Sequence, residues 1–322
     1  MSVMNVRRHH ISGIALAAAT ALGLGTLSAC SSEATAGNTE KFDVVASFYP
    51  MAYLAEQIGG DHVNVTSLTE PGQEPHDLEI SAKQTAQLQE SDAALYIKGL
   101  QPSVDEAISQ SGVKTKIDAS SLTTLEDHGN LEEDGHGAEE EEHSGEEESA
   151  LDPHIWLDPV RYAQVAEGVG KIFEKADPDN AAAYRKNTEA LVKKLDDLDT
   201  RFEDGLKNTR TKVFFTNHAA FSYLAERYGL TMEAISGLDP ESEPSAARIR
   251  ELQQEAKADG VTTVFYETLV SDKTAKILAE DAGLKTDVLD PLEGITDKSR
   301  GDDYIQVMDA NLKALETALG AK

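Results

Sequence analysis

The 322 residues of this chain, 40% of them hydrophobic and 27% charged, are enough for two globular domains of ordinary size. The net charge of −29 leaves no excess of Lys and Arg for phosphate contacts, which argues against nucleic-acid binding. A single cysteine, Cys30, excludes an intramolecular disulfide.

The first 30 residues have the pattern of an export signal. Arg7 and Arg8 precede an apolar run over 11–27, which is shorter than the ~20 residues of a membrane-spanning helix. The run leads into Leu-Ser-Ala-Cys, which resembles the lipobox of bacterial lipoproteins, so we predict that Cys30 is lipidated. The alternative is a chance cysteine beside an ordinary cleavage site. Residues 31–40, rich in Ser, Glu, Ala and Thr, are predicted to form a flexible tether.

The segment 41–177 alternates strand-like and helical patterns and is predicted to form an N-terminal α/β lobe. The expected strands are 42–46, 62–68 and 93–97, and the expected helices are 51–58, 81–90 and 103–109. Strands separated by helices of this length are typical of βαβ units with a parallel sheet.

The same alternation restarts at Lys212 and predicts a second, C-terminal α/β lobe over 210–322. The expected strands are 213–215, 232–235, 261–266 and 286–289, and the expected helices are 221–228, 245–257, 272–282 and 302–319. The fold class is therefore α/β, with two lobes that each contain a parallel sheet.

The lobes are separated by the segment 178–209, which is predicted to be one long linking helix. Leu191, Leu195, Leu198 and Phe202 recur at three- and four-residue spacing and form a single apolar stripe. At a rise of 1.5 Å per residue, an unbroken helix of this length spans about 45 Å and forms a rigid connection.

One segment, 126–148, interrupts the first lobe. It contains twelve carboxylates, no Lys or Arg, and His128, His136 and His143. We predict a disordered insertion, because such a composition cannot bury a core. Its histidines could form an auxiliary, zinc-collecting metal site; the alternative is a solvated acidic loop that contains three histidines by chance.

Three other histidines lie at strand ends or in turn-rich loops. His76 follows a predicted strand in a loop rich in Pro and Gly, and His154 lies in Asp-Pro-His-Ile-Trp-Leu-Asp-Pro. His218 comes directly after the first strand of the second lobe, and Asp290 ends a later strand. Because ligands bind beyond the carboxyl ends of strands in open α/β sheets, these four residues are candidate metal ligands.

Three imidazoles and one carboxylate suit the four-coordinate geometry of Zn²⁺. The candidate residues lie far apart in the sequence, however, and match no local zinc-binding pattern. From the residues alone it stays open whether they share a metal or are ordinary surface and capping residues.

A family resemblance adds to these patterns. Three segments, in their order and separation, resemble the signature segments of the zinc/manganese ABC-transporter solute-binding proteins: 71–79, 152–159 and 217–221. The acidic, His-bearing insertion before the second segment is similar too. The resemblance implies two lobes bridged by a rigid helix, with one metal in the cleft between them. It implies His76 and His154 as ligands from the first lobe, and His218 and Asp290 from the second.

The resemblance also implies a function. The protein would capture zinc outside the cytoplasmic membrane and deliver it to the permease and ATPase of an ABC importer, as a lipid-anchored monomer without enzymatic activity. Many manganese-binding members have Glu where this chain has His218, and a third imidazole favours Zn²⁺ over the harder Mn²⁺. A manganese-binding member of the family is the alternative.

The fourth ligand stays open between Asp290, Glu74 and water. Some zinc-binding members have Glu directly before the first ligand histidine, whereas here Pro75 precedes His76 and Glu74 lies one residue further away. Glu267, which follows another predicted strand, is an alternative ligand or a residue behind the ligands.

Two other classes of protein fit parts of the sequence. Three histidines and a water also hold catalytic zinc, so a zinc-dependent exported hydrolase is possible in principle, with Glu267 or Asp290 as the base. The chain has no His-Glu-x-x-His helix and no nucleophile elbow, which argues against this class. A role in cell adhesion would explain a lipid anchor but not the histidine segments.

Overall fold

The computed structural model describes residues 41–128 and 151–322. The predicted signal peptide and tether (1–40) and residues 129–148 of the predicted insertion lie outside the described residues. Among the helices that are described, none has both the length and the apolar character needed to cross a membrane.

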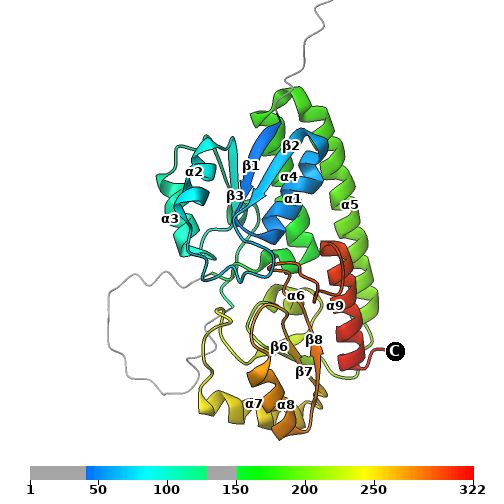
Figure 1. The fold of residues 1–322 in the computed structure, drawn as a ribbon. Helices are drawn as coiled ribbons and strands as arrows, with labels where there is room; N and C mark the ends of the chain where they lie inside the picture. The colour runs from blue at the N-terminus through cyan, green and yellow to red at the C-terminus, as the bar shows by residue number, and fades with distance from the viewer. Residues whose placement is uncertain (1–40, 129–150) are drawn as a thin grey trace, which may run out of the picture. The chain divides into compact units, whose positions relative to one another are not determined.

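The first lobe is built on a four-stranded parallel sheet with the strand order β2-β1-β3-β4 (Figure 1). Its strands are β1 (Phe42–Ala46), β2 (Val63–Ser67), β3 (Ala93–Tyr96) and β4 (Thr115–Asp118). Its helices are α1 (Tyr49–Gly59), α2 (Ala82–Glu90) and α3 (Pro102–Gln110). Side chains alternate across the sheet: Val44 packs in the cluster that includes α1, and Val45 packs in the cluster that includes α2 and α3.

The second lobe repeats this topology, with the strand order β6-β5-β7-β8 and all strands parallel. Its strands are β5 (Val213–Thr216), β6 (Thr231–Ala234), β7 (Thr263–Tyr266) and β8 (Lys285–Val288). Its helices are α6 (Ser222–Arg227), α7 (Ala246–Ala258), α8 (Lys273–Ala282) and α9 (Tyr304–Leu319). Phe215 packs on the side of α7 and α8, whereas Phe214 joins the larger cluster that also contains the core of the first lobe.

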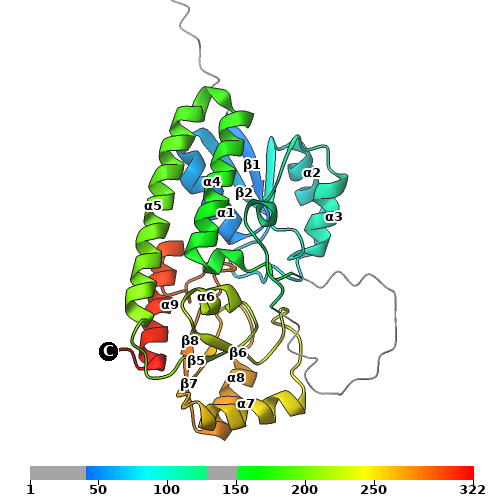
Figure 2. The same cartoon turned by 180° about the vertical axis from the view of Figure 1, so that it is seen from behind.

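Two helices separate the sheets in the sequence: α4 (Pro159–Ala176) and α5 (Ala181–Leu206). Helix α5 confirms the predicted link between the lobes, although it begins later than expected because Pro178–Asn180 forms a 3-10 turn. It contacts α1 and α4 in the first lobe and α9 in the second, as Figure 2 illustrates. Its 26 residues span about 39 Å.

Helix α5 presents one apolar stripe to both lobes. Near its start, the ring of Tyr184 lies 5.6 Å from that of Phe173 on α4, and near its end Phe202 stacks on Tyr228 at 5.2 Å. The same stripe includes the leucines that the sequence pattern singled out. The link is therefore packed against both lobes along its length.

Helix α4, which the sequence pattern does not predict, packs closely on α5. Gly168 and Gly170 weaken the helical pattern, because glycine is unfavourable in helix interiors. A Cβ atom at Gly170 would lie 2.3 Å from Thr188 Oγ1 on α5, so glycine permits this close approach. At the other end of α4, the side chain of Asp158 caps the start of the helix, four residues after His154.

Replacing Gly170 by Ala should therefore destabilise the fold through a clash with Thr188. We expect the clash to cost about 1–3 kcal/mol of unfolding free energy, measured by chemical denaturation. In a double-mutant cycle, Thr188→Ala should be less costly in the Gly170→Ala background than in the wild type, by about 1 kcal/mol or more. Gly112→Ala is the control, since a Cβ atom there meets nothing within 4 Å. Strictly additive effects of the two changes would contradict the contact.

Candidate metal centre

Three histidines and one glutamate meet where the two lobes join. His76, His154, His218 and Glu293 each offer one ligand atom, and these atoms all lie within 4.8 Å of one another. Glu293 Oε1 lies 3.2, 3.7 and 3.4 Å from the Nε2 atoms of the three histidines in that order. Zinc–ligand bonds of about 2.0–2.2 Å place the ligand atoms of a tetrahedral shell about 3.3–3.5 Å apart. The observed spacing fits a single ion of this kind.

Each lobe supplies two of the four side chains. His76 lies in the loop between β2 and α2, and His154 directly precedes the 3-10 turn Ile155–Leu157 that leads into α4. His218 comes two residues after β5, and Glu293 lies in the loop after β8. The second lobe thus uses the carboxyl ends of its parallel strands, as open α/β sheets commonly do.

Two carboxylates orient two of the imidazoles. Asp152 Oδ1 lies 2.7 Å from His154 Nδ1 and also accepts a hydrogen bond from the His154 backbone N–H at 2.9 Å. Glu267 Oε1 lies 2.6 Å from His218 Nδ1 and accepts from the His218 backbone N–H at 3.2 Å. Carboxylates placed in this way hold the proton on Nδ1 and leave the Nε2 lone pair free for a metal. Both Nε2 atoms are buried and have no hydrogen-bond partner among the described residues.

His76 is the only member of the group that is open to solvent, with 11% of its side chain exposed. The neighbouring Glu74 does not join the group. Its Oε1 accepts a hydrogen bond from the backbone N–H of His76 at 3.1 Å, and its Oε2 accepts from that of Asp77 at 3.3 Å. Glu74, which the sequence left open as a ligand, therefore braces the loop that carries His76.

The charges of the group balance one another. Burial disfavours the ionised form of Glu293, but the positive charge of His218 and the hydrogen bond with His76 hold the pKa of Glu293 well below its usual range. Burial disfavours protonated His218, but Glu267 and Glu293 raise its pKa well above the ordinary value. Without a metal, protons on the imidazoles compensate the buried carboxylates. A divalent cation can take the place of those protons.

The structure places Glu293, and not Asp290, beside the three histidines, so we propose Glu293 in place of Asp290 as the fourth ligand. Asp290 Oδ1 accepts a hydrogen bond from the Leu292 backbone N–H at 2.9 Å, and Thr268 Oγ1 donates to Asp290 Oδ2 at 3.2 Å. Asn311 holds the Asp290 backbone through its N–H and its carbonyl, at 2.9 and 2.7 Å. Burial raises the pKa of Asp290 to about 6.

The turn that Asp290 forms explains how Glu293 reaches the centre. Leu292 has a φ of 60°, a left-handed conformation that is costly for a leucine. The hydrogen bond from its N–H to Asp290 holds this turn in place, and Glu293 follows directly. The sequence signal was present, because Glu293 is a second carboxylate in the same strand-end loop. Whether Asp290 or Glu293 points toward the histidines depends on the backbone conformation at Leu292.

The histidines of the predicted insertion do not join the centre as the structure describes it. His136 and His143 lie outside the described residues, as does Cys30. His128 is described, and its Nδ1 lies 2.7 Å from Asp152 Oδ2, behind His154. Glu126 and His128 thus contact the folded chain, through Arg161, Tyr223 and Asp152, and the rest of the predicted insertion stays a prediction.

The fold and this group of side chains define a class of protein: a two-lobed α/β binding protein with a long linking helix and a set of metal-binding side chains between the lobes. A family model described as "ZnuA: Zinc-uptake complex component A periplasmic" matches residues 44–318. The chain belongs to this family.

Proteins with curated names and solved structures agree with this assignment. The chain is 40% identical over 296 residues to the zinc-binding lipoprotein AdcA of Streptococcus pneumoniae R6; the match covers 90% of this chain but only 58% of that protein. It is 36% identical over 306 residues to the high-affinity zinc uptake system protein ZnuA of Bacillus subtilis 168, covering 92% and 94% of the two chains. The Zn(II)-bound ZnuA-like domain of S. pneumoniae AdcA superposes with a TM-score of 0.71 at 36% identity, covering 87% and 99%.

The charge of Glu293 should set the basicity of the surrounding imidazoles. In metal-free protein, Glu293→Gln should lower the pKa values of His154 and His218, because the carboxylate that favours their protonated forms is gone. The pKa values can be followed by NMR titration of the histidine ring resonances. Asp290→Asn is the matched control: its Oδ1 can still accept the Leu292 N–H and keep the turn, so both pKa values should change much less. Equal effects of the two substitutions would contradict the arrangement.

Proposed function

We propose that this protein captures zinc outside the cytoplasmic membrane and delivers it to the permease of an ABC importer. The observation that carries the proposal is the group of His76, His154, His218 and Glu293, in which the Glu293 oxygen lies 3.2, 3.7 and 3.4 Å from the three ring nitrogens, distances that suit one four-coordinate ion. The names of the family and of the relatives support zinc as the cargo.

The donor set favours zinc over manganese. Three imidazole nitrogens and one carboxylate oxygen suit a borderline metal in four-coordinate geometry, whereas Mn²⁺ is better served by additional carboxylates and waters. Two other carboxylates near the group, those of Asp152 and Glu267, are held by the Nδ1 atoms of His154 and His218. They orient the ligands and are not free to add oxygen donors.

The same donor set supports a carrier and not a hydrolase. A catalytic zinc site keeps one coordination position open for water, while a site with four protein ligands is closed. Here four side chains can supply all four ligands, and three of them are fully buried. A zinc ion held in this way has no position at which to activate water.

Delivery follows from the division of ligands between the lobes. Two ligands come from each lobe, so a partner that separated the lobes would leave the metal with half of its shell. The permease and ATPase of an importer are the partners that the family description supports. A lipid anchor at Cys30 would hold the protein, as a monomer, on the outer face of the membrane beside that permease.

The four side chains should contribute to one zinc site. At a free zinc concentration 1,000 times the dissociation constant, binding adds about 4.1 kcal/mol to stability, which appears as a rise in melting temperature. His154→Ala, His218→Ala and Glu293→Gln should each lose most of this rise and weaken zinc binding in a competition titration against a chelator. Asp290→Asn should keep most of both the temperature rise and the affinity, because the Asn Oδ1 can still accept the Leu292 N–H that holds the turn. A full zinc-dependent shift in His218→Ala would refute the shared site, and tighter binding of Mn²⁺ than of Zn²⁺ would overturn the choice of cargo.

Zinc affinity should fall as the pH is lowered, and the fall should begin above pH 6.5. Neighbouring carboxylates raise the pKa values of His154 and His218 above the ordinary 6.5, so protons compete with zinc at a higher pH than usual. Where both are protonated, zinc displaces two protons and its apparent affinity changes by up to about 100-fold per pH unit.

The stability of the metal-free protein should show the opposite trend. A histidine with a raised pKa in the folded state stabilises the fold below the unfolded pKa of about 6.5, and this contribution is lost as the pH rises through the raised value. Calorimetric titrations and melting curves across this range measure both trends. An affinity that stays constant from pH 8 to pH 6 would contradict the assigned charges.

A further inference from the structure

Helix α6 of the second lobe contacts the chain that carries His154 in the first lobe. The helix begins four residues after His218, so it belongs to the same stretch of chain as that ligand. Tyr223 and Arg227 lie four residues apart on α6 and therefore on one face of the helix. Tyr223 contacts the first lobe just before His154, and Arg227 contacts it just after.

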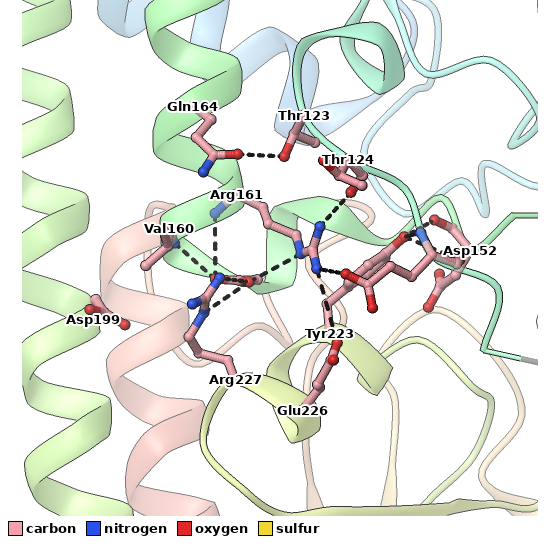
Figure 3. A network of polar contacts seen from close by, with 12 residues as sticks. Thr123, Thr124, Asp152, Val160, Arg161, Gln164, Asp199, Tyr223, Glu226 and Arg227 are labelled. Atoms are coloured by element: carbon pink, nitrogen blue, oxygen red, sulfur yellow. Dashed lines mark hydrogen bonds and ion pairs between the residues drawn. The ribbon is translucent and has the colours of Figure 1, made fainter.

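Tyr223 is buried against the first lobe. Its hydroxyl donates a hydrogen bond to the backbone carbonyl of Asp152 at 2.8 Å and accepts one from the backbone N–H of Glu126 at 2.9 Å. The guanidinium of Arg161, on α4, lies over the Tyr223 ring at 4.6 Å from its centroid (Figure 3). Asp152 is two residues before His154, and its side chain orients that imidazole. Tyr223 therefore holds the first lobe directly beside a ligand.

Arg227 forms an ion pair with Asp158 between the lobes. Arg227 Nε lies 3.0 Å from each Asp158 oxygen, and Nη2 lies 2.6 Å from Oδ2. Asp158 is 1% exposed and also accepts the backbone N–H of Val160 at the start of α4. Such a fork of charged hydrogen bonds is strong and directional. Only the buried 3-10 turn Ile155–Leu157 separates Asp158 from His154, so a displacement of Asp158 would move this ligand.

These two contacts fix something that the carboxylates behind the ligands do not. Asp152 and Glu267 each orient a histidine of their own lobe, whereas Tyr223 and Arg227 join one lobe to the other. The rings of His154 and His218 lie 5.3 Å apart in this arrangement. The apparent affinity for a ligand scales with the fraction of molecules that already have the binding-competent geometry.

We propose that Tyr223 and Arg227 are positioning residues for the metal centre. They hold the lobes of the metal-free protein so that His154 and His218 lie within one coordination shell before the ion arrives. This inference rests on the proposed function, because it assigns the two residues a role in zinc binding. A partner that separated the lobes would have to break both contacts.

The first test is zinc affinity, measured by competition with a chelator. Arg227→Gln, Asp158→Asn and Tyr223→Phe should each weaken zinc binding by about 10-fold. Asp158→Asn keeps an oxygen for the start of α4, and Tyr223→Phe keeps the buried ring, so both variants preserve the fold. The double variant Asp158→Asn/Arg227→Gln should bind no more weakly than the weaker single variant, because both changes remove one ion pair. Arg227→Lys keeps the charge and should restore part of the affinity.

The second test measures the lobes without metal. In a Cys30→Ser background, spin labels on Glu90→Cys in α2 and Lys257→Cys in α7 report the distance between the lobes by pulsed electron paramagnetic resonance; both positions are exposed. We expect one narrow distribution for the metal-free protein that zinc leaves almost unchanged. Arg227→Gln and Tyr223→Phe should broaden the metal-free distribution, and zinc should narrow it again.

Two controls separate positioning from stability. Arg201→Gln breaks an ion pair of 2.7 Å with Asp309, between α5 and α9, and should change neither affinity nor distances. Gly170→Ala destabilises the fold by a clash inside the first lobe and its link, and should likewise leave both measurements unchanged.

The outcomes are distinguishable. Unchanged affinity in Arg227→Gln and Tyr223→Phe overturns the inference. A loss of affinity with unchanged metal-free distances also overturns it, because the two residues would then act on the ligands and not on the lobes. A full zinc-dependent shift in His218→Ala refutes the proposed centre, whereas the metal-free distances still decide whether Tyr223 and Arg227 fix the lobes.

Discussion

The structure depends on one electrostatic constraint: the carboxylate of Glu293 is buried among three imidazoles where the lobes join. An isolated buried charge costs several kcal/mol, so it persists only with compensating partners. Protons on the histidines provide compensation in the metal-free protein, and in the proposed zinc-bound form the cation would provide it. The carboxylates of Asp152 and Glu267 lie behind two of these imidazoles. Each fixes the orientation of its imidazole and adds a negative charge next to it.

The lobes are also held together by contacts that need no metal. Trp156 donates a hydrogen bond from Nε1 to the carbonyl of Pro291 at 2.7 Å, and the hydroxyl of Tyr304 donates to the carbonyl of Trp156 at 2.5 Å. One apolar cluster includes side chains from both lobes and from α5. Opening the junction would expose part of this cluster to water, at about 25 cal/mol for each Å² of apolar surface. The ligands are therefore presented by a prepacked junction, and His76, on a partly exposed loop, is the member that can move at least cost.

The sequence predicted the parts of this architecture that depend on local patterns. Alternating strand and helix patterns were enough to predict two lobes with parallel sheets. The stripe of leucines in α5 was enough to predict the helix that links them. The family segments led to His76, His154 and His218, which the structure brings together. Glu293 was missed because its position depends on a turn at Leu292, which Asn311 supports from α9. Similarly, His128 pairs with Glu226 across the junction, and no local pattern reveals such a contact.

The position of Asp152 has a thermodynamic consequence. One carboxylate accepts hydrogen bonds from two imidazoles, so its negative charge is shared between them. A proton on either ring makes that ring a stronger hydrogen-bond donor and draws the shared charge toward itself, which lowers the basicity of the other ring. Protonation of the two rings is therefore anticooperative, and linkage requires each proton to weaken the binding of the other by the same factor. Because His128 is 19% exposed and His154 is fully buried, a proton that exchanges with solvent at the outer ring acts on the inner ring through the carboxylate between them.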